Sequence, residues 1–173
     1  NSVYHSGTLG AAFTARNAGI TGIAVSQAVT GWGIEGQGIE EVLKNQFWQT
    51  AAEVAKTAVA AIISDPPKQP AVLNINVPNK PIDELKGWSY TKVAKRSTRS
   101  MTEAKLEPKP GHENSYRVQM SWGDPVSQPI ETDVGAVMND YASLTWINSF
   151  EAITPEDTKM VDQSLDSLFD QKR

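Results

Sequence analysis

The start of the chain alternates between helical and strand-like spacing of apolar side chains. Leu9, Ala12 and Phe13 recur at the i, i+3, i+4 spacing of one helical face, which predicts a helix over residues 8–17. The next apolar run, GIAVSQ at Gly22–Gln27, is short and holds β-branched residues, so it predicts a buried strand. A helix, a tight turn and a buried strand in close succession form half of an α/β unit.

A longer helical pattern occupies the middle of the chain. Apolar residues recur at helical spacing from Ile39 to Ile63, and we predict one continuous helix there. Asp65-Pro66-Pro67 ends this helix. Every second residue is then apolar over Ala71–Pro78, which predicts a strand, and Trp88–Lys95 is a second strand candidate.

Residues 97–130 have a different character from the rest of the chain. They are polar, contain four of the ten prolines, and place a strand-like run at Tyr116–Trp122 after a turn at Pro110-Gly111. Such a segment has too few apolar residues to form its own core. We therefore predict an extended hairpin arm, which either packs on another subunit or stays mobile.

The last part of the chain returns to a compact pattern. We predict a short helix over Asp133–Tyr141 and a strand over Ser143–Asn148. A final helix is expected to begin with Thr154 as N-cap and Pro155 at its first position. Its apolar stripe consists of Val161, Leu165 and Leu168.

Composition and charge narrow the possible functions. A chain of 173 residues suits one domain, and a net charge of −4 does not provide the basic surface that nucleic-acid binding needs. No apolar run approaches the roughly 18 residues that cross a membrane. The sequence has no cysteine, which excludes disulfides and thiolate ligands and fits a reducing cytoplasm, where we expect the protein. With two histidines, a three-histidine metal site within one chain is impossible.

Ser6-Gly7-Thr8, at the head of the first predicted helix, has two interpretations. A phosphate site at a helix start needs free backbone N–H groups, a glycine for close approach and hydroxyl groups, and these three residues supply all of them. Serine and threonine are also common helix caps, which is the simpler interpretation of the residue types alone. Both interpretations stay open at this point.

Other polar residues are weaker candidates for a site. Asn74 and Asn76 share one face of a predicted strand, where they either form the polar wall of a cleft or bind neighbouring loop backbone. His5 is either a general acid beside a phosphate or a structural residue. Asp133 is interpreted as a helix cap, and no pair of carboxylates stands out as a general acid and base. We therefore predict no catalytic or metal-binding residue within the chain.

A basic group lies where the strand candidate Trp88–Lys95 meets the polar segment 97–130. It consists of Lys92, Lys95, Arg96 and Arg99. Its simplest interpretation is a solvated strand end and loop. It could also steer an anionic substrate.

Several stretches resemble the SurE family of metal-dependent nucleotidases. The stretches are VYHSGTLGAAFTARNAGITGIAVSQ, AVLNINVPNKPIDELKGWSYTKV and ETDVGAVMNDYASLTWI, with the polar segment 97–130 where the family carries a protruding hairpin. They are similar to family patterns that read Y-S-G-T-V-G-A-A, L-N-I-N-V-P and T-D-x-x-A-x-x-x-G-Y-x-S-x-T-P-L. Four matches in the right order are far more specific than any one of them.

The resemblance implies a fold and an organisation of the chain. The fold is α/β with three layers, a mostly parallel sheet flanked by helices in a Rossmann-type core, a protruding β-hairpin arm and a C-terminal helix. Residues 1–173 form one partial domain, in which 1–96 are the second half of the core, 97–130 the arm, and 131–173 the returning helix and strand and the C-terminal oligomerisation helix. A homodimer or homotetramer is expected to form through the arm and the C-terminal helix.

The resemblance also implies an activity and a site. The activity is hydrolysis of nucleoside monophosphates with a divalent metal, Mg²⁺ or Mn²⁺, and Ser6, Gly7 and Thr8 match the family's phosphate-contacting residues. The family binds its metal through an N-D-D-G strand end and an S-G-x-N motif, neither of which is in this chain, so we expect this chain alone to be inactive. The alternatives are a non-catalytic oligomerising fragment and an anion-binding module.

This sequence departs from the family pattern at three places. His5 stands where tyrosine is usual, Asp140 takes the place of a glycine, and Trp146-Ile147 replaces Pro-Leu. The last two changes put local packing in doubt more than phosphate binding.

Overall fold

The structure of the chain is a computed structural model that describes residues 2–30, 39–148 and 159–170. The helices found there, including two 3-10 turns, are η1 Ser2–His5, α1 Gly7–Asn17, α2 Ile39–Lys44, α3 Trp48–Ser64, η2 Ile82–Glu84, α4 Asp133–Met138 and α5 Lys159–Asp170. The strands are β1 Gly22–Gln27, β2 Val72–Val77, β3 Gly87–Tyr90, β4 Met101–Pro108, β5 Tyr116–Trp122 and β6 Tyr141–Ile147. The expected Thr154 cap of the final helix lies outside the described residues.

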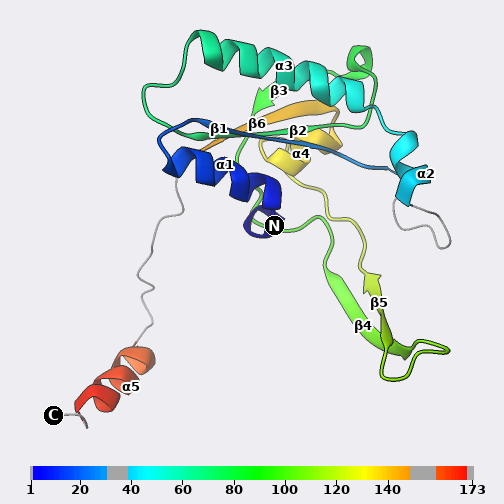
Figure 1. The fold of residues 1–173 in the computed structure, drawn as a ribbon, viewed down its shortest axis with the longest axis vertical. Helices are drawn as coiled ribbons and strands as arrows, with labels where there is room; N and C mark the ends of the chain where they lie inside the picture. Colours follow the sequence, from blue (N-terminus) through cyan, green and yellow to red (C-terminus); the bar gives the residue numbers. More distant parts are fainter. Residues whose placement is uncertain (1, 31–38, 149–158, 171–173) are drawn as a thin grey trace.

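Among the described residues, four strands form the main sheet, in the order β1-β2-β6-β3. β1 runs parallel to β2, β6 runs antiparallel to β2, and β3 runs parallel to β6. Helix α3 covers one face of the sheet, while α1 and α4 lie on the other (Figure 1). The predicted three-layer α/β fold with a mostly parallel sheet is therefore confirmed.

The sheet separates two apolar clusters because the side chains of β2 alternate between its faces. Val72 packs with Leu9, Ala12 and Ala24 on the α1 side. On the α3 side a second cluster is formed by Ala51, Leu73, Ile75 and Val77, with partly buried residues of α3 around it. Asn74 and Asn76 project to the α1 side, the same face as Val72.

The prediction of one continuous helix over residues 39–63 is wrong, because α2 and α3 are separate helices. At the break, the backbone N–H of Phe47 donates to Asn79 Oδ1 at 2.9 Å. The carbonyl of Leu43, which that N–H would bind in a continuous helix, instead accepts from Trp48 Nε1 at 2.8 Å. Two side chains therefore bind the N–H and the C=O that would form one hydrogen bond of a continuous helix. The periodicity of apolar residues does not reveal such a break.

β4 and β5 form the predicted hairpin arm, which extends away from the sheet (Figure 1). Every residue of both strands is exposed. Paired residues of an antiparallel ladder share a face, so the pairs Leu106–Val118 and Ala104–Met120 lie on one face and Lys105–Gln119 on the other. The arm therefore has an apolar face that no other described residue covers.

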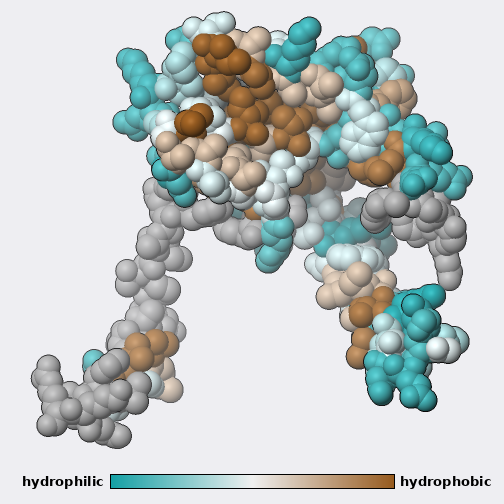
Figure 2. Space-filling model, in the orientation of Figure 1, coloured by the Kyte–Doolittle hydropathy of each residue, from teal (hydrophilic) through white to brown (hydrophobic). Residues whose placement is uncertain are grey.

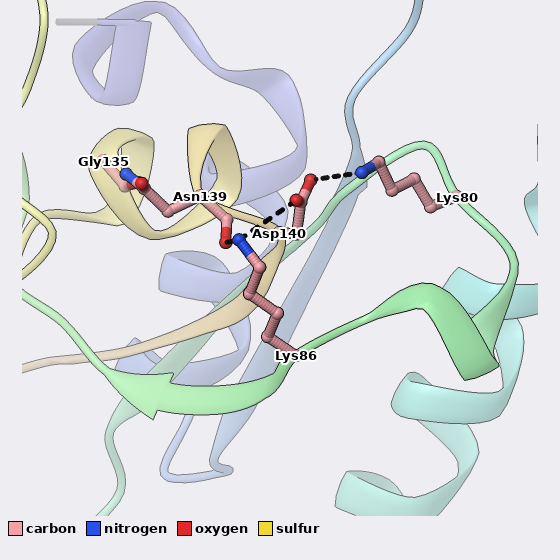
Figure 3. Close-up of polar contacts among 5 residues, drawn as sticks. All are labelled: Lys80, Lys86, Gly135, Asn139 and Asp140. Atoms are coloured by element: carbon pink, nitrogen blue, oxygen red, sulfur yellow. Dashed lines mark hydrogen bonds and ion pairs between the residues drawn. The ribbon is translucent and has the colours of Figure 1, made fainter.

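The turn between α4 and β6 contains an unusual backbone conformation at Asp140, where φ is +70°. This left-handed region strongly favours glycine. Asp140 Oδ1 lies 2.8 Å from Lys80 Nζ and Oδ2 lies 3.4 Å from Lys86 Nζ (Figure 3). The positive φ explains why the family pattern has glycine at this position. In this chain the residue is an aspartate, and two ion pairs hold its side chain.

Apolar side chains also gather on the outside of the molecule over α3 (Figure 2). Ile63, near the end of this helix, is 76% exposed. Beside it, an open groove of about 920 Å³ runs between α3 and β3, and Trp88 and Tyr90 pack edge to face along it with ring centroids 5.1 Å apart. In the part of the chain that the structure describes, no helix has the length and apolar character to cross a membrane.

Candidate functional site

A cleft of about 240 Å³ opens at the carboxyl ends of β1 and β2, on the side of the sheet that carries α1 and α4. The lining comes from β1, β2, α1, α4, the 3-10 turn η1, the N-cap residue of α1 and the residue after β1. The lining residues are Val3, Ser6, Leu9, Ser26, Gln27, Ala28, Asn74, Asn76, Asp133, Val134, Val137 and Met138. In open α/β sheets, ligands bind outside the carboxyl ends of parallel strands. The cleft is therefore the candidate functional site.

The start of α1 forms one edge of this cleft. Ser6 is the N-cap, with extended backbone, and its Oγ accepts from the backbone N–H of Leu9 at 3.2 Å. The backbone N–H groups of Gly7 and Thr8 have no hydrogen-bond partner among the described residues. Gly7 and Thr8 are both exposed, so these two N–H groups remain accessible at the positive end of the helix dipole.

The two interpretations of Ser6-Gly7-Thr8 are thus compatible. The cap uses the acceptor capacity of Ser6 Oγ, and the hydroxyl proton stays available to donate elsewhere. Ser6 lines the cleft, whereas Gly7 and Thr8 stand outside its lining, on the surface of the first helical turn. The geometry offers an anion two free N–H groups and one hydroxyl donor.

Asn74 and Asn76 lie in the wall of the cleft, one of the two alternatives that the sequence left open. Asn74 is only 4% exposed, and Asn76 is half-buried. Neither carboxamide makes a hydrogen bond to another described residue. Across the sheet, Asn74 is in register with Thr145 and Asn76 with Ser143, so a polar strip crosses this face.

Asp133 serves as a structural anchor in the cleft wall. It is the first residue of α4, one position inside the helix from its N-cap Thr132. Its Oδ1 accepts from the backbone N–H groups of Ala94 and Val134, both at 2.9 Å. The prediction that Asp133 is a cap is one residue off, because Thr132 is the N-cap, but the carboxylate does bind one N–H group of the first turn, that of Val134.

The basic group does not enter the cleft. Arg96 is exposed and lines a separate small cavity of about 110 Å³, which shares Val3, Asp133 and Val134 with the cleft. Lys92, at the base of the arm, forms an isolated bridge with Thr132. His5 is exposed and is not among the residues that line the cleft.

Sequence reasoning missed the apolar wall that α4 contributes. Val134, Val137 and Met138 line the cleft together with the asparagines of β2. A short helix was predicted there, but its placement follows from the antiparallel pairing of β2 with β6, which no local pattern reveals.

The metal that the resemblance implies finds no ligand set here. Within the described ranges, no three His, Asp or Glu side chains lie close enough together to hold a metal ion. The acidic residue of the cleft, Asp133, already uses Oδ1 for two backbone N–H groups. The described residues therefore do not fit a metal centre.

A sheet flanked by helices on both faces, with a cleft at the carboxyl ends of parallel strands beside a helix start, defines an α/β protein of the Rossmann-like class. Residues 1–100 match the family model described as Survival protein SurE. The chain belongs to the SurE family.

Relatives and a solved structure agree with this family. The chain is 29% identical to a 5'/3'-nucleotidase SurE from Erwinia tasmaniensis over 149 residues, which covers 84% of this chain and 50% of that protein. It is 32% identical to a 5'-nucleotidase SurE from Coxiella burnetii over 112 residues, or 65% of this chain and 38% of that protein. The crystal structure of the SurE protein from Aquifex aeolicus has a similar fold, with a TM-score of 0.62 at 23% identity, and the match covers 96% of this chain and 60% of that one. The chain thus spans half or less of the length of these two curated relatives.

Proposed function

We propose that this chain is part of a phosphatase that hydrolyses the phosphomonoester of nucleoside monophosphates. The observation that carries the proposal is the start of α1, where the N–H groups of Gly7 and Thr8 are free beside a cleft at the carboxyl ends of β1 and β2. Two relatives of the chain bear the names 5'/3'-nucleotidase and 5'-nucleotidase, which supports this substrate class.

In this proposal, Ser6, Gly7 and Thr8 hold the phosphate group. The two N–H groups donate to phosphate oxygens, and the Ser6 hydroxyl donates a third hydrogen bond while its oxygen continues to cap the helix. These donors are fixed by the helix before the substrate arrives, so they stabilise the negative charge that builds on the phosphate oxygens in the transition state.

The proposal includes a divalent metal, Mg²⁺ or Mn²⁺, bound by residues that are not in this chain. Such an ion would supply charge neutralisation and a reactive water. The contribution of the described residues is to bind and orient the phosphate.

We also propose that the protein forms a homodimer or homotetramer through its arm and C-terminal helix, in the cytoplasm. The uncovered apolar face of the arm, which includes Leu106 and Val118, supports a protein contact there. Cysteine-free composition fits a reducing compartment.

The activity is tested by phosphate release from nucleoside monophosphates by the whole protein, with added Mg²⁺ or Mn²⁺. The informative variant is Ser6→Asp, because aspartate caps a helix as well as serine does but repels a phosphate. We expect unfolding of this variant to match the wild type, and its KM to rise by about ten- to a hundredfold. Ser6→Ala removes the cap as well and is expected to lose about 1 kcal/mol of stability.

Two results would contradict parts of the proposal. An unchanged KM in Ser6→Asp would mean that the phosphate does not bind at the start of α1. Phosphate binding without turnover, with either metal, would favour the alternative function of an anion-binding module.

A further inference from the structure

The carboxamide of Asn74 is a buried polar group that the fold itself does not use. The residue is 4% exposed and lines the cleft, and the described part of the chain gives its side chain no hydrogen-bond partner. By contrast, other buried polar side chains on this face are paired. Thr91 Oγ1 lies 2.8 Å from Ser143 Oγ and 2.6 Å from Thr145 Oγ1. Burying an unpaired amide is costly, so a free amide in the wall of a cleft points to a ligand.

The rest of the cleft indicates the chemistry of that ligand. Leu9 lies on one wall, and Val134, Val137 and Met138 lie on the α4 wall. The lining residues, all of them in the described ranges, include no lysine or arginine. Half of the lining residues are polar, and the carboxylate among them, Asp133, already accepts from two backbone N–H groups. Apolar walls beside neutral amides and hydroxyls, with no cationic side chain, suit an uncharged heterocycle better than a phosphate.

We propose that this cleft binds the nucleobase of the substrate and that Asn74 contacts the edge of the base. This inference rests on the proposed function, in which the phosphate binds at the start of α1. A carboxamide presents one acceptor and two donor hydrogens side by side, which matches the adjacent donor and acceptor groups on base edges. Because Ser6 and Asn74 line the same cleft, one nucleotide can reach both ends of the site.

Steady-state kinetics of the whole protein separate this role from a structural one. Asn74→Leu keeps the volume and removes the hydrogen-bonding groups, so the protein is expected to stay as stable as the wild type or become slightly more stable. We expect kcat/KM for AMP and UMP to fall about tenfold, while kcat/KM for p-nitrophenyl phosphate, which has no base, stays unchanged. The matched control is Ser143→Ala, which removes a fully buried hydroxyl from the neighbouring strand outside the cleft.

An equal loss for all three substrates would overturn the inference and leave the proposed phosphatase activity in place. The inference would also be overturned if Asn74→Leu kept the wild-type ratio of kcat/KM for AMP and UMP to kcat/KM for p-nitrophenyl phosphate.

A binding experiment tests the inference without any turnover. Ligand-observed NMR with adenosine and uridine, which carry no phosphate, is expected to detect binding to the wild type and to Ser143→Ala, and about tenfold weaker binding to Asn74→Leu. If the protein releases no phosphate but binds nucleosides through Asn74, the proposed function fails and the base site stands. If the wild type binds neither nucleoside, the base site is wrong whatever the activity is.

Discussion

Lys80 Nζ lies 2.8 Å from Asp140 Oδ1 and joins the segment after β2 to the turn between α4 and β6. Lys86 adds a second ion pair to Asp140 and also donates to the carbonyl of Asn139 at 3.2 Å (Figure 3). These contacts surround the residue whose backbone is left-handed, with φ of +70°. The two lysines therefore compensate for the absence of glycine at this turn.

Substitutions at Asp140 separate the backbone conformation from the ion pairs. Asp140→Ala loses both ion pairs and keeps the Cβ that disfavours a positive φ, so it is expected to be less stable than the wild type. Asp140→Gly also loses the pairs but removes the Cβ, and we expect it to be about 1 kcal/mol more stable than Asp140→Ala. Chemical denaturation measures the difference. Equal stability of the two variants would show that the positive φ imposes no cost.

The Lys80–Asp140 pair also predicts how stability depends on pH. The hydrogen bond from Lys80 is the main cause that lowers the pKa of Asp140 below its ordinary value of 3.8, and burial opposes it. A lowered folded-state pKa means that the carboxylate stabilises the fold above about pH 3.8 and loses this contribution as pH falls through the folded-state pKa.

The pKa of Lys80 shifts in the opposite direction from that of Asp140. Its hydrogen bond to Asp140 raises its pKa above 10.5, so its contribution is complete below about pH 10.5 and is lost as pH rises through the raised value. We expect the stability difference between wild type and Asp140→Asn to be largest between these limits and to shrink at both ends. A difference that stays constant from about pH 3 to pH 7 would contradict the prediction.

Substituting alanine for Gly22 and for Gly10 is expected to change the stability of the protein in opposite directions. A Cβ at Gly22 would overlap the backbone carbonyl of Ala12, because α1 packs directly on β1 at this point. Gly22→Ala is therefore expected to lose about 1–3 kcal/mol of stability. Gly10, in α1, has nothing within 4 Å of the same position, and Gly10→Ala is expected to gain about 0.5–1 kcal/mol through helix propensity. Thermal unfolding of both variants checks the prediction, and similar melting temperatures would contradict it.

A charged residue on the apolar face of the arm is expected to weaken self-association of the protein. Val118 is 55% exposed on the apolar face, and Gln119 lies next to it on the opposite face. If the arm packs on another copy of the chain, Val118→Lys is expected to reduce the molar mass measured by light scattering, because burying the charge is unfavourable. Gln119→Lys is the matched control and should leave the mass unchanged. An identical mass for the two variants would place the subunit contact elsewhere.

Local patterns in the sequence predicted most of the elements but not the long-range arrangement of the site. The spacing of Leu9 and Ala12 and the apolar run at Gly22–Gln27 were sufficient to predict α1 and β1, because each signal lies within the element itself. The cap at Ser6 was also predictable from residue type. The break before α3 was not, since it depends on Asn79, a residue far along the chain.

The site was predictable only in part for the same reason. The sequence placed Asn74 and Asn76 on one face of a strand and left a cleft wall as one of two alternatives. It could not decide between them, because α4, which completes the cleft, follows the arm in the chain. Likewise, a glycine replaced by Asp140 was visible in the sequence, while its two lysine partners were not. Contacts between distant segments depend on the topology of the sheet, which the local spacing of apolar and polar residues does not predict.

The position of the arm has a consequence for the order of folding. Val72 of β2 pairs with Ile147 of β6, so the sheet closes around a long segment that contains the whole arm. The arm pairs locally, and the bond from Gly123 N–H to the Ser100 carbonyl, 3.0 Å long, closes its base. A hairpin that forms first shortens the loop that β2 and β6 must close, which lowers the entropic cost of their pairing. We therefore expect the arm to speed folding, and a substitution such as Gly111→Val, at its turn with φ of +75°, is expected to slow refolding in stopped-flow experiments.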